Sequence, residues 1–301
     1  MVTAKHKIDL GAHRASARAG GVSWSLIGIY VSLWCAVAVT SWAALSDYIP
    51  LWLGGMGNAL FLYFLAQINH EAFHRNVCGK DLRLAWLNDL MGGTVSFAFW
   101  FSFPAFKATH LSHHSHLNQD GKDSDMWTSR KGVLPTFLAC ASLLFKYEAD
   151  IWAWWREGRL DRSVLIRFYI ERAIAIAIVA LAFANGYGLE ITMLWLLPAV
   201  AGLLAIVFLF TYVVHHPHTE MDAIGGTNTV LAAPWLQPIV TFIFAFHNYH
   251  IVHHLFPRIP FFRLGTIFRE IRPQLVERGA PIMVLGASPS DDARSTSPQS
   301  V

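Results

Sequence analysis

Charged side chains are scarce in this chain of 301 residues. Asp, Glu, Lys and Arg make up 14% of the sequence, against roughly a quarter in a typical soluble domain, and 54% of the residues are hydrophobic. This composition excludes an ordinary water-soluble protein. The net charge of +3 is explained by membrane topology, as described below, so we expect no nucleic acid among the partners.

Cysteine is also scarce, and no targeting segment is apparent. Cys35, Cys78 and Cys140 lie far apart and form no Cys-x-x-Cys pair, which argues against a disulfide framework and against a thiolate metal site. Residues 1–23 are polar and basic and lack the apolar core of a cleavable signal peptide. Neither end is long enough for a flavin or cytochrome domain.

Long apolar runs are the most prominent feature of the sequence. Each is close to the ~20 residues that a helix needs to cross a membrane, so we predict an all-α integral membrane protein with four transmembrane helices. The runs are residues 24–46, 49–69, 173–189 and 191–214. Shorter runs at 95–106, 133–145 and 229–246 indicate interfacial, re-entrant or half-buried helices.

Lys and Arg predict the orientation, because they concentrate on the cytoplasmic side of membrane proteins. The turns between the first two runs and between the last two contain neither residue. Both termini and the segment joining the second and third runs are therefore predicted to be cytoplasmic. We divide the chain into a cytoplasmic segment at 1–23, a membrane domain at 24–285 and a polar, disordered tail at 286–301.

Histidine is abundant, and most of it falls on that predicted cytoplasmic side. Thirteen of the fifteen histidines form four groups near the inner ends of the apolar runs. The groups are His70 and His74; His110, His113, His114 and His116; His215, His216 and His218; and His247, His250, His253 and His254. Neutral imidazole is the commonest protein ligand for metals, so a cytoplasmic helical cap carrying a metal site is expected.

The spacing supports this interpretation. Residues three and four apart share one face of a helix, and this relation recurs within the first, second and fourth groups. A single zinc takes three or four protein ligands, so this many imidazoles indicates two metal ions. Imidazole suits zinc, copper, iron and nickel alike, and the spacing leaves the metal open.

These motifs resemble the membrane fatty acid desaturase superfamily, which also contains hydroxylases and carotenoid-modifying enzymes. The segments that carry the resemblance are "HEAFHRN", "LNDLMG", "THLSHHSHLNQDGKDSD" and "NYHIVHHLFPRIPFFRL". The resemblance implies three histidine boxes around a di-iron centre that uses oxygen and external electrons. It also implies an additional ligand near the inner end of the last span, where we choose His215 over His216 and His218.

The predicted metal ligands are therefore nine histidines: His70, His74, His110, His113, His114, His215, His250, His253 and His254. Ligating imidazoles usually donate their second N–H to a neighbouring group, which fixes the ring. For such supporting roles we predict His116, His247, Asp125 and Asn88, with Asp120 and Asp123 as further carboxylates in the same turn.

The predicted activity is oxygen-dependent desaturation of an acyl or acyl-like lipid taken from the bilayer, by an enzyme with two iron ions. A hydroxylase or carotenoid ketolase on the same scaffold is the alternative. Electrons are expected from a separate ferredoxin-like protein. Arg258, Arg263, Arg269 and Arg272 could form its docking patch or anchor the chain to the membrane surface.

An alternative of another class rests on His70, Glu71 and His74. Together they spell His-Glu-x-x-His, which on a helix can hold zinc with the glutamate as the general base of a metalloprotease. An intramembrane protease of this type needs one further ligand and would leave the second and fourth histidine groups without a function.

Overall fold

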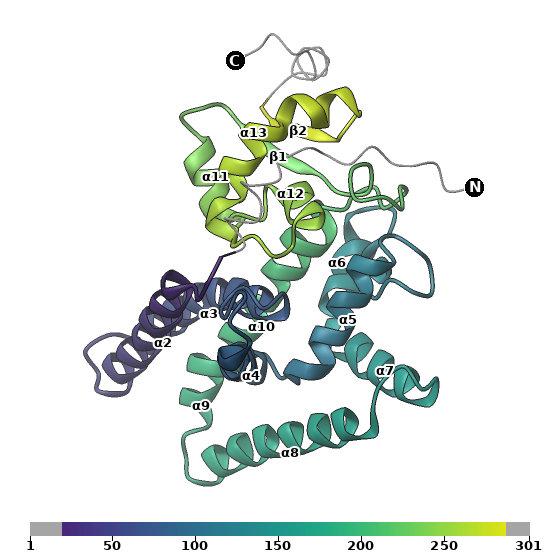
Figure 1. Ribbon diagram of the computed structural model, residues 1–301. Coiled ribbons are helices and arrows are strands. Elements are labelled where there is room, and N and C mark those ends of the chain that lie inside the picture. Colours follow the sequence, from purple (N-terminus) through teal and green to yellow (C-terminus); the bar gives the residue numbers. More distant parts are fainter. Residues whose placement is uncertain (1–19, 287–301) are drawn as a thin grey trace.

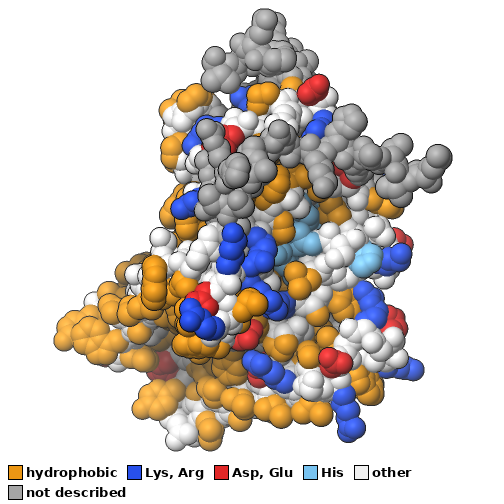
Figure 2. All heavy atoms as spheres, viewed as in Figure 1, with side chains coloured by type: hydrophobic (Ala, Val, Ile, Leu, Met, Phe, Trp, Pro, Cys, Tyr) orange, Lys and Arg blue, Asp and Glu red, His pale blue; other side chains and the backbone are white. Residues whose placement is uncertain are grey.

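The computed structural model describes residues 20–286. Two long helices, α2 (Trp24–Leu45) and α3 (Leu51–Phe73), lie side by side and antiparallel (Figure 1). Both fit membrane crossing by length and composition, and much of the surface over them is apolar (Figure 2). The N-terminal segment 1–23 lies largely outside the described residues, and so does the tail at 286–301 except for Gly286.

A third helix of this kind, Gly188–Val213, is composite. It contains α9 (Gly188–Ile191), the π-helical η3 (Thr192–Leu196), α10 (Leu197–Ile206) and the π-helical η4 (Val207–Val213).

A proline and an asparagine explain how this helix packs against α3. Pro198 has no N–H, so it cannot bond to the Leu194 carbonyl four residues earlier. The Asn58 amide of α3, which is fully buried, donates to that carbonyl at 2.8 Å. Gly55 makes the close contact possible, because a Cβ atom there would lie 2.4 Å from the Met193 carbonyl oxygen.

The fourth predicted span is not confirmed. Residues 173–184 belong to α8 (Arg162–Ala184), whose first half carries Arg167, Glu171 and Arg172. The apolar part of this helix would be about 18 Å long at 1.5 Å per residue, which is short of the ~30 Å hydrocarbon core. Among the described residues, three helices rather than four meet the length and composition needed to cross a membrane. In Figure 1, α8 lies apart from α2 and α3, across the base of the view.

The remaining elements carry or support the histidines. The helices are α4 (Ala85–Ala98), α5 (Phe103–Ser115), α6 (Val133–Ala141), α7 (Leu143–Arg156), α11 (Gln237–Ile243), α12 (His250–Leu255) and α13 (Leu264–Glu277). Short 3-10 turns occur at η1 (Leu82–Leu84), η2 (Met126–Thr128) and η5 (Phe261–Arg263). Helices α11, α12 and α13 gather at the end of the molecule opposite α8 (Figure 1).

Two short strands correct the all-α prediction. β1 (Thr229–Ala232) pairs in parallel with β2 (Ile282–Leu285), with Thr229 opposite Ile282 and Ala232 opposite Leu285. The apolar run at 229–246 is therefore not a single helix: it starts as a strand and becomes helical only in α11. The Val230 side chain is fully buried, and the Val230 N–H donates to the Asn248 carbonyl at 2.8 Å, so the strand supports the segment that leads into α12.

Candidate metal centre

Three helix segments deliver most of the predicted ligands to one place. His70 lies in the last turn of α3 and His74 caps that helix, while the second set lies on α5 and the third on α12. His215 lies two residues after the end of η4. Together, these segments place all nine predicted ligand histidines in two neighbouring groups.

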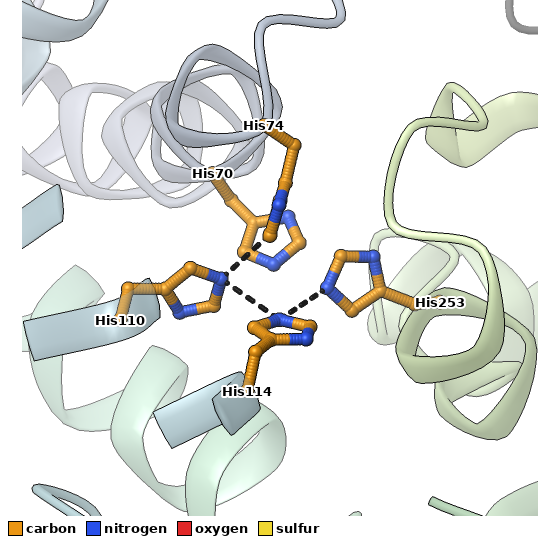
Figure 3. A group of neighbouring side chains, drawn as sticks. All are labelled: His70, His74, His110, His114 and His253. Atoms are coloured by element: carbon orange, nitrogen blue, oxygen red, sulfur yellow. Dashed lines mark hydrogen bonds between the residues drawn. The ribbon is translucent and has the colours of Figure 1, made fainter. Parts of the chain in front are cut away.

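The first group contains His70, His74, His110, His114 and His253, which point toward a common centre (Figure 3). The Nε2 atoms of His74 and His110 lie 2.8 Å apart, those of His110 and His114 3.1 Å apart, and those of His114 and His253 3.0 Å apart. Both ring nitrogens of His70 are buried without a hydrogen-bond partner. Such an orphaned nitrogen is expected where an ion supplies the missing partner.

The second group contains His113, His215, His250 and His254. Its Nε2 atoms also lie close together, at 3.1 Å for His113 and His215, 2.9 Å for His215 and His250, and 3.0 Å for His250 and His254.

Hydrogen bonds alone cannot satisfy the ring nitrogens of the second group. The Nδ1 of His113 faces an Asp123 carboxylate oxygen at 2.8 Å, and the Nδ1 of His215 faces the Gly226 carbonyl oxygen at 3.1 Å. Both partners only accept, so each neutral ring carries its proton on Nδ1 and a lone pair on Nε2. The two lone pairs then meet at 3.1 Å. Either a proton on His113 or a metal ion relieves this repulsion, but only a metal ion engages all four Nε2 atoms.

The spacing of the nitrogens fits a particular coordination geometry. Metal–imidazole bonds of about 2.0–2.1 Å put ligands at right angles about 2.9 Å apart, and tetrahedral ligands about 3.3 Å apart. The neighbouring Nε2 atoms of both groups lie 2.8–3.1 Å apart. The spacing of neighbouring nitrogens in both groups is therefore close to that of ligands at right angles around one metal ion.

Carboxylates make the second group favourable for a cation. Burial lowers the pKa of His113, but the carboxylates of Asp125 and Asp123 outweigh this effect and raise it to about 9. Burial raises the pKa of Asp125 to about 6. The same negative charge that holds a proton on His113 would stabilise a metal ion bound at its Nε2.

The predicted supporting role of Asp125 needs correction. Its nearest carboxylate oxygen lies 3.8 Å from His113 Nδ1, beyond hydrogen-bond range. Asp123 accepts that N–H instead and also accepts the backbone N–H groups of Asn118 and Asp125. The tight turn after α5 turns the first carboxylate of the "DSD" sequence inward, which residue spacing alone did not show.

Asn88 and His116 also have other partners than those predicted. The Asn88 side chain accepts the Val77 N–H and donates to the Ala85 carbonyl, so it braces the loop after α3. His116 contacts Ser112 on its own helix. These hydrogen bonds satisfy backbone or neighbouring groups, and none of them joins Asn88 or His116 to a predicted ligand.

His247 does lie beside the centre. It is buried, its ring stacks on Phe210 at 4.1 Å between centroids, and it lies 4.5 Å from the His70 ring. Two alternatives to His215 were considered as the additional ligand. His216 is exposed, and His218 belongs to neither group. His218 Nδ1 lies 3.3 Å from the Asn118 amide oxygen.

Sequence reasoning missed the turn that supports His215. The Asn118 amide donates to the carbonyls of Glu220 and Gly226, the second of which also faces His215. A Cβ atom on Gly226 would lie 2.4 Å from the Glu220 carbonyl oxygen, so only glycine fits. The "GG" pair at 225–226 was a possible signal, since glycine often marks close backbone approach.

A mainly apolar cavity adjoins both groups. His70, His110, His113, His247 and His250 line one side of it. The rest of its wall is mostly aromatic and aliphatic and includes Phe73, Phe99, Phe101, Phe106, Leu203, Val207 and Phe210. Phe101 and Phe106 precede the second histidine box in the sequence, so the cavity wall and the predicted ligands come from the same segment. Such a space suits a hydrocarbon chain held next to the metal ligands.

Glu71 does not occupy the position that the protease alternative requires. Its carboxylate accepts hydrogen bonds from Asn76 at 2.9 Å and from Gln67 at 3.5 Å. Asn76 also donates to the Pro257 carbonyl, so Glu71 helps tie the end of α3 to the loop after α12. His70 and His74 meet three further histidines, more than the single additional ligand of that class.

Comparison with known proteins agrees with this geometry. The chain is 24% identical over 264 residues to a beta-carotene ketolase from Paracoccus sp. (strain N81106), covering 86% of this chain and 94% of that protein. It is 27% identical over 204 residues to a second beta-carotene ketolase, from Paracoccus sp. (strain PC1), with coverage of 65% and 70%. It is 22% identical over 277 residues to an sn-1 oleoyl-lipid 12-desaturase from Anabaena variabilis, with coverage of 82% and 74%.

A family model described as fatty acid desaturase matches residues 46–286. This range includes the three helices that carry the histidine boxes and the segment that carries His215. The match extends over most of the sequence, and the chain therefore belongs to the fatty acid desaturase family.

Proposed function

We propose that this protein is an oxygen-dependent lipid desaturase that holds two iron ions, one in each histidine group. The observation that carries the proposal is the meeting of nine imidazoles in two groups beside one apolar cavity. Iron is proposed because the family resemblance implies oxidation of C–H bonds at a di-iron centre and because imidazole is a suitable ligand for iron. The bound metals would supply the oxidising power that side chains lack.

The reaction is balanced by one oxygen molecule, two electrons and two protons. The substrate loses two hydrogens and gains a carbon–carbon double bond, and the oxygen leaves as two water molecules. The chain's own residues would position the substrate and hold the metals. The apolar cavity would keep a saturated segment beside the two groups, and Asp123 would keep the proton of His113 on Nδ1.

Electrons would come from a separate ferredoxin-like protein. A basic surface favours docking of an acidic electron donor. Arg263, at the start of α13, and Arg269, within that helix, are exposed and could provide such a surface. We also propose that both termini and the metal groups are cytoplasmic, which requires the chain to cross the membrane once more between α3 and Gly188, in addition to the three candidate spans. The turns at Ser46–Tyr48 and Asn185–Tyr187 contain no Lys or Arg, as expected for the opposite side.

A ketolase acting on a carotenoid is the second candidate. The observation that favours it is the alignment with the Paracoccus beta-carotene ketolase, which spans 94% of that protein. Ketolation and desaturation both begin with removal of a hydrogen atom from carbon, so the histidine groups alone do not separate them.

The test combines metal content with product analysis. The protein would be expressed with added iron, purified in detergent and examined by elemental analysis, with His114→Ala and His254→Ala removing one ligand from each group. His216→Ala is the matched control, because His216 is exposed and lies outside both groups. We expect about two irons per chain in the wild type and the control, and a loss in each ligand variant.

Mass spectrometry of lipids from expressing cells would then identify the reaction. A product that has lost two hydrogens supports desaturation, and one that has also gained an oxygen supports ketolation. A single zinc that survives both ligand substitutions would contradict the proposed function.

A further inference from the structure

A second apolar cavity lies directly outside the one that adjoins the histidines. It measures about 240 Å³, against about 90 Å³ for the inner cavity. Its lining comes from the end of α4, the start of α7, the end of η3 and α10: Phe99, Trp100, Leu144, Leu196, Ala199, Val200 and Leu203.

Two side chains separate the cavities. Phe99 and Leu203 line both of them, and both are buried. Gly202, next to Leu203, lets the Phe99 ring lie against the backbone of α10, because a Cβ atom there would be 3.3 Å from a ring carbon of Phe99. Phe99 and Leu203 are therefore the side chains that the two cavities share, and a path from one space to the other would pass between them.

The outer cavity faces the surface that a bilayer would cover. Val200 lines it and is 47% exposed on α10, within the candidate membrane-spanning helix Gly188–Val213. Trp100, which also lines it, is a turn residue with φ of 66°. The Trp100 carbonyl accepts a hydrogen bond from Arg172 of α8 at 3.0 Å.

We propose that this outer cavity is a lateral portal, through which one acyl chain of a bilayer lipid passes between Phe99 and Leu203 to the metal groups. The inference rests on the proposed function and narrows its substrate to lipids presented by the membrane rather than to water-soluble acyl thioesters. Three observations support it: the shared partition, the apolar lining, and the exposure of the portal on a candidate span.

Photo-crosslinking in lipid nanodiscs tests the portal. The full-length, iron-loaded protein would be reconstituted with a phospholipid that carries an alkyl diazirine near the middle of one chain. Adducts would be mapped by mass spectrometry. In the wild type we expect adducts on Val200 at the portal and on Phe210 or Thr211, which line only the inner cavity.

Val200→Trp should fill the portal from its exposed side with little effect on folding. Leu197→Trp is the matched control, since Leu197 is 52% exposed on the same helix and lines neither cavity. Adducts on Phe210 and Thr211, and turnover of the phospholipid, should fall about tenfold in Val200→Trp and stay at wild-type levels in Leu197→Trp. A second blocking variant, Leu203→Trp, should have the same effect at the partition itself.

Inner-cavity adducts that persist at wild-type yield in both blocking variants, with iron content intact, would overturn the portal. This outcome differs from failure of the proposed function. If the wild type converts no lipid, the proposed activity fails, whereas adducts on Phe210 and Thr211, and their loss in Val200→Trp, still report whether the chain enters by this route.

Discussion

Replacing Asp123 with asparagine should weaken metal binding in one histidine group and spare the other. The Asp123 carboxylate accepts the Nδ1–H of His113 at 2.8 Å and is itself buried. The substitution removes a negative charge and leaves a weaker acceptor for an imidazole that must present its other nitrogen to the metal. Loss of such a supporting group typically lowers metal affinity 10–100-fold, which corresponds to about 1.4–2.7 kcal/mol.

The assay would be iron retained per chain during dialysis against increasing chelator. Asp123→Asn should fall from about two irons to about one at a chelator concentration that leaves the wild type fully loaded. Asp125→Asn is the matched control, because its carboxylate lies 3.8 Å from His113 Nδ1 and makes no hydrogen bond to it. A smaller loss is expected there, since only a nearby charge is removed.

Two results would refute this reasoning. If Asp123→Asn retains both irons as firmly as the wild type, the carboxylate does not support a ligand. If both irons leave together while the protein remains folded, Asp123 does not act on one group alone. Size-exclusion elution and near-UV circular dichroism would establish that the variant is folded.

Three further predictions concern the supports of the site and of the fold. Gly226→Ala should displace the carbonyl that faces His215, because the new Cβ would lie 2.4 Å from the Glu220 carbonyl oxygen. Iron content should then fall toward one per chain. Unchanged iron content would show that the turn does not position His215. Asn58→Leu should lower stability in detergent by about 1–3 kcal/mol, since it leaves the buried Leu194 carbonyl without its donor, and a melting temperature equal to that of the wild type would contradict this. Removing iron with a chelator should lower the melting temperature and adding iron should restore it, because a ligand that binds only the folded state stabilises that state. Equal melting temperatures for the iron-free and iron-loaded protein would argue against a metal in these groups.

The sequence by itself determined which residues could gather. Histidines three and four apart share a face of a helix because the helix repeats every 3.6 residues, and this local rule identified eight of the nine histidines that the structure brings together. The ninth, His215, was chosen from the family resemblance. The sequence also predicted the two long apolar helices and the composite helix at Gly188–Val213, since the length of an apolar run is a property of a continuous segment. Nothing distant in the chain is needed for either inference.

The division into two groups depends on tertiary packing. His110 and His114 lie one turn apart and join the first group, whereas His113 points toward His215 and joins the second. On α12 the split is reversed, with His253 in the first group and His250 and His254 in the second. Which imidazole meets which is decided by how α5 and α12 are rotated against α3 and η4, and helix rotation is set by packing rather than by spacing.

Other features were equally beyond the sequence. The choice of Asp123 over Asp125 depends on the path of one turn, and the pairing of Thr229–Ala232 with Ile282–Leu285 joins strands that are far apart in the chain. The portal depends on Phe99 lying against Gly202 of another helix. Local periodicity specifies helices and the faces of helices, but contacts between distant segments arise only when the whole chain packs. Those contacts decide which histidines meet and which cavity adjoins them.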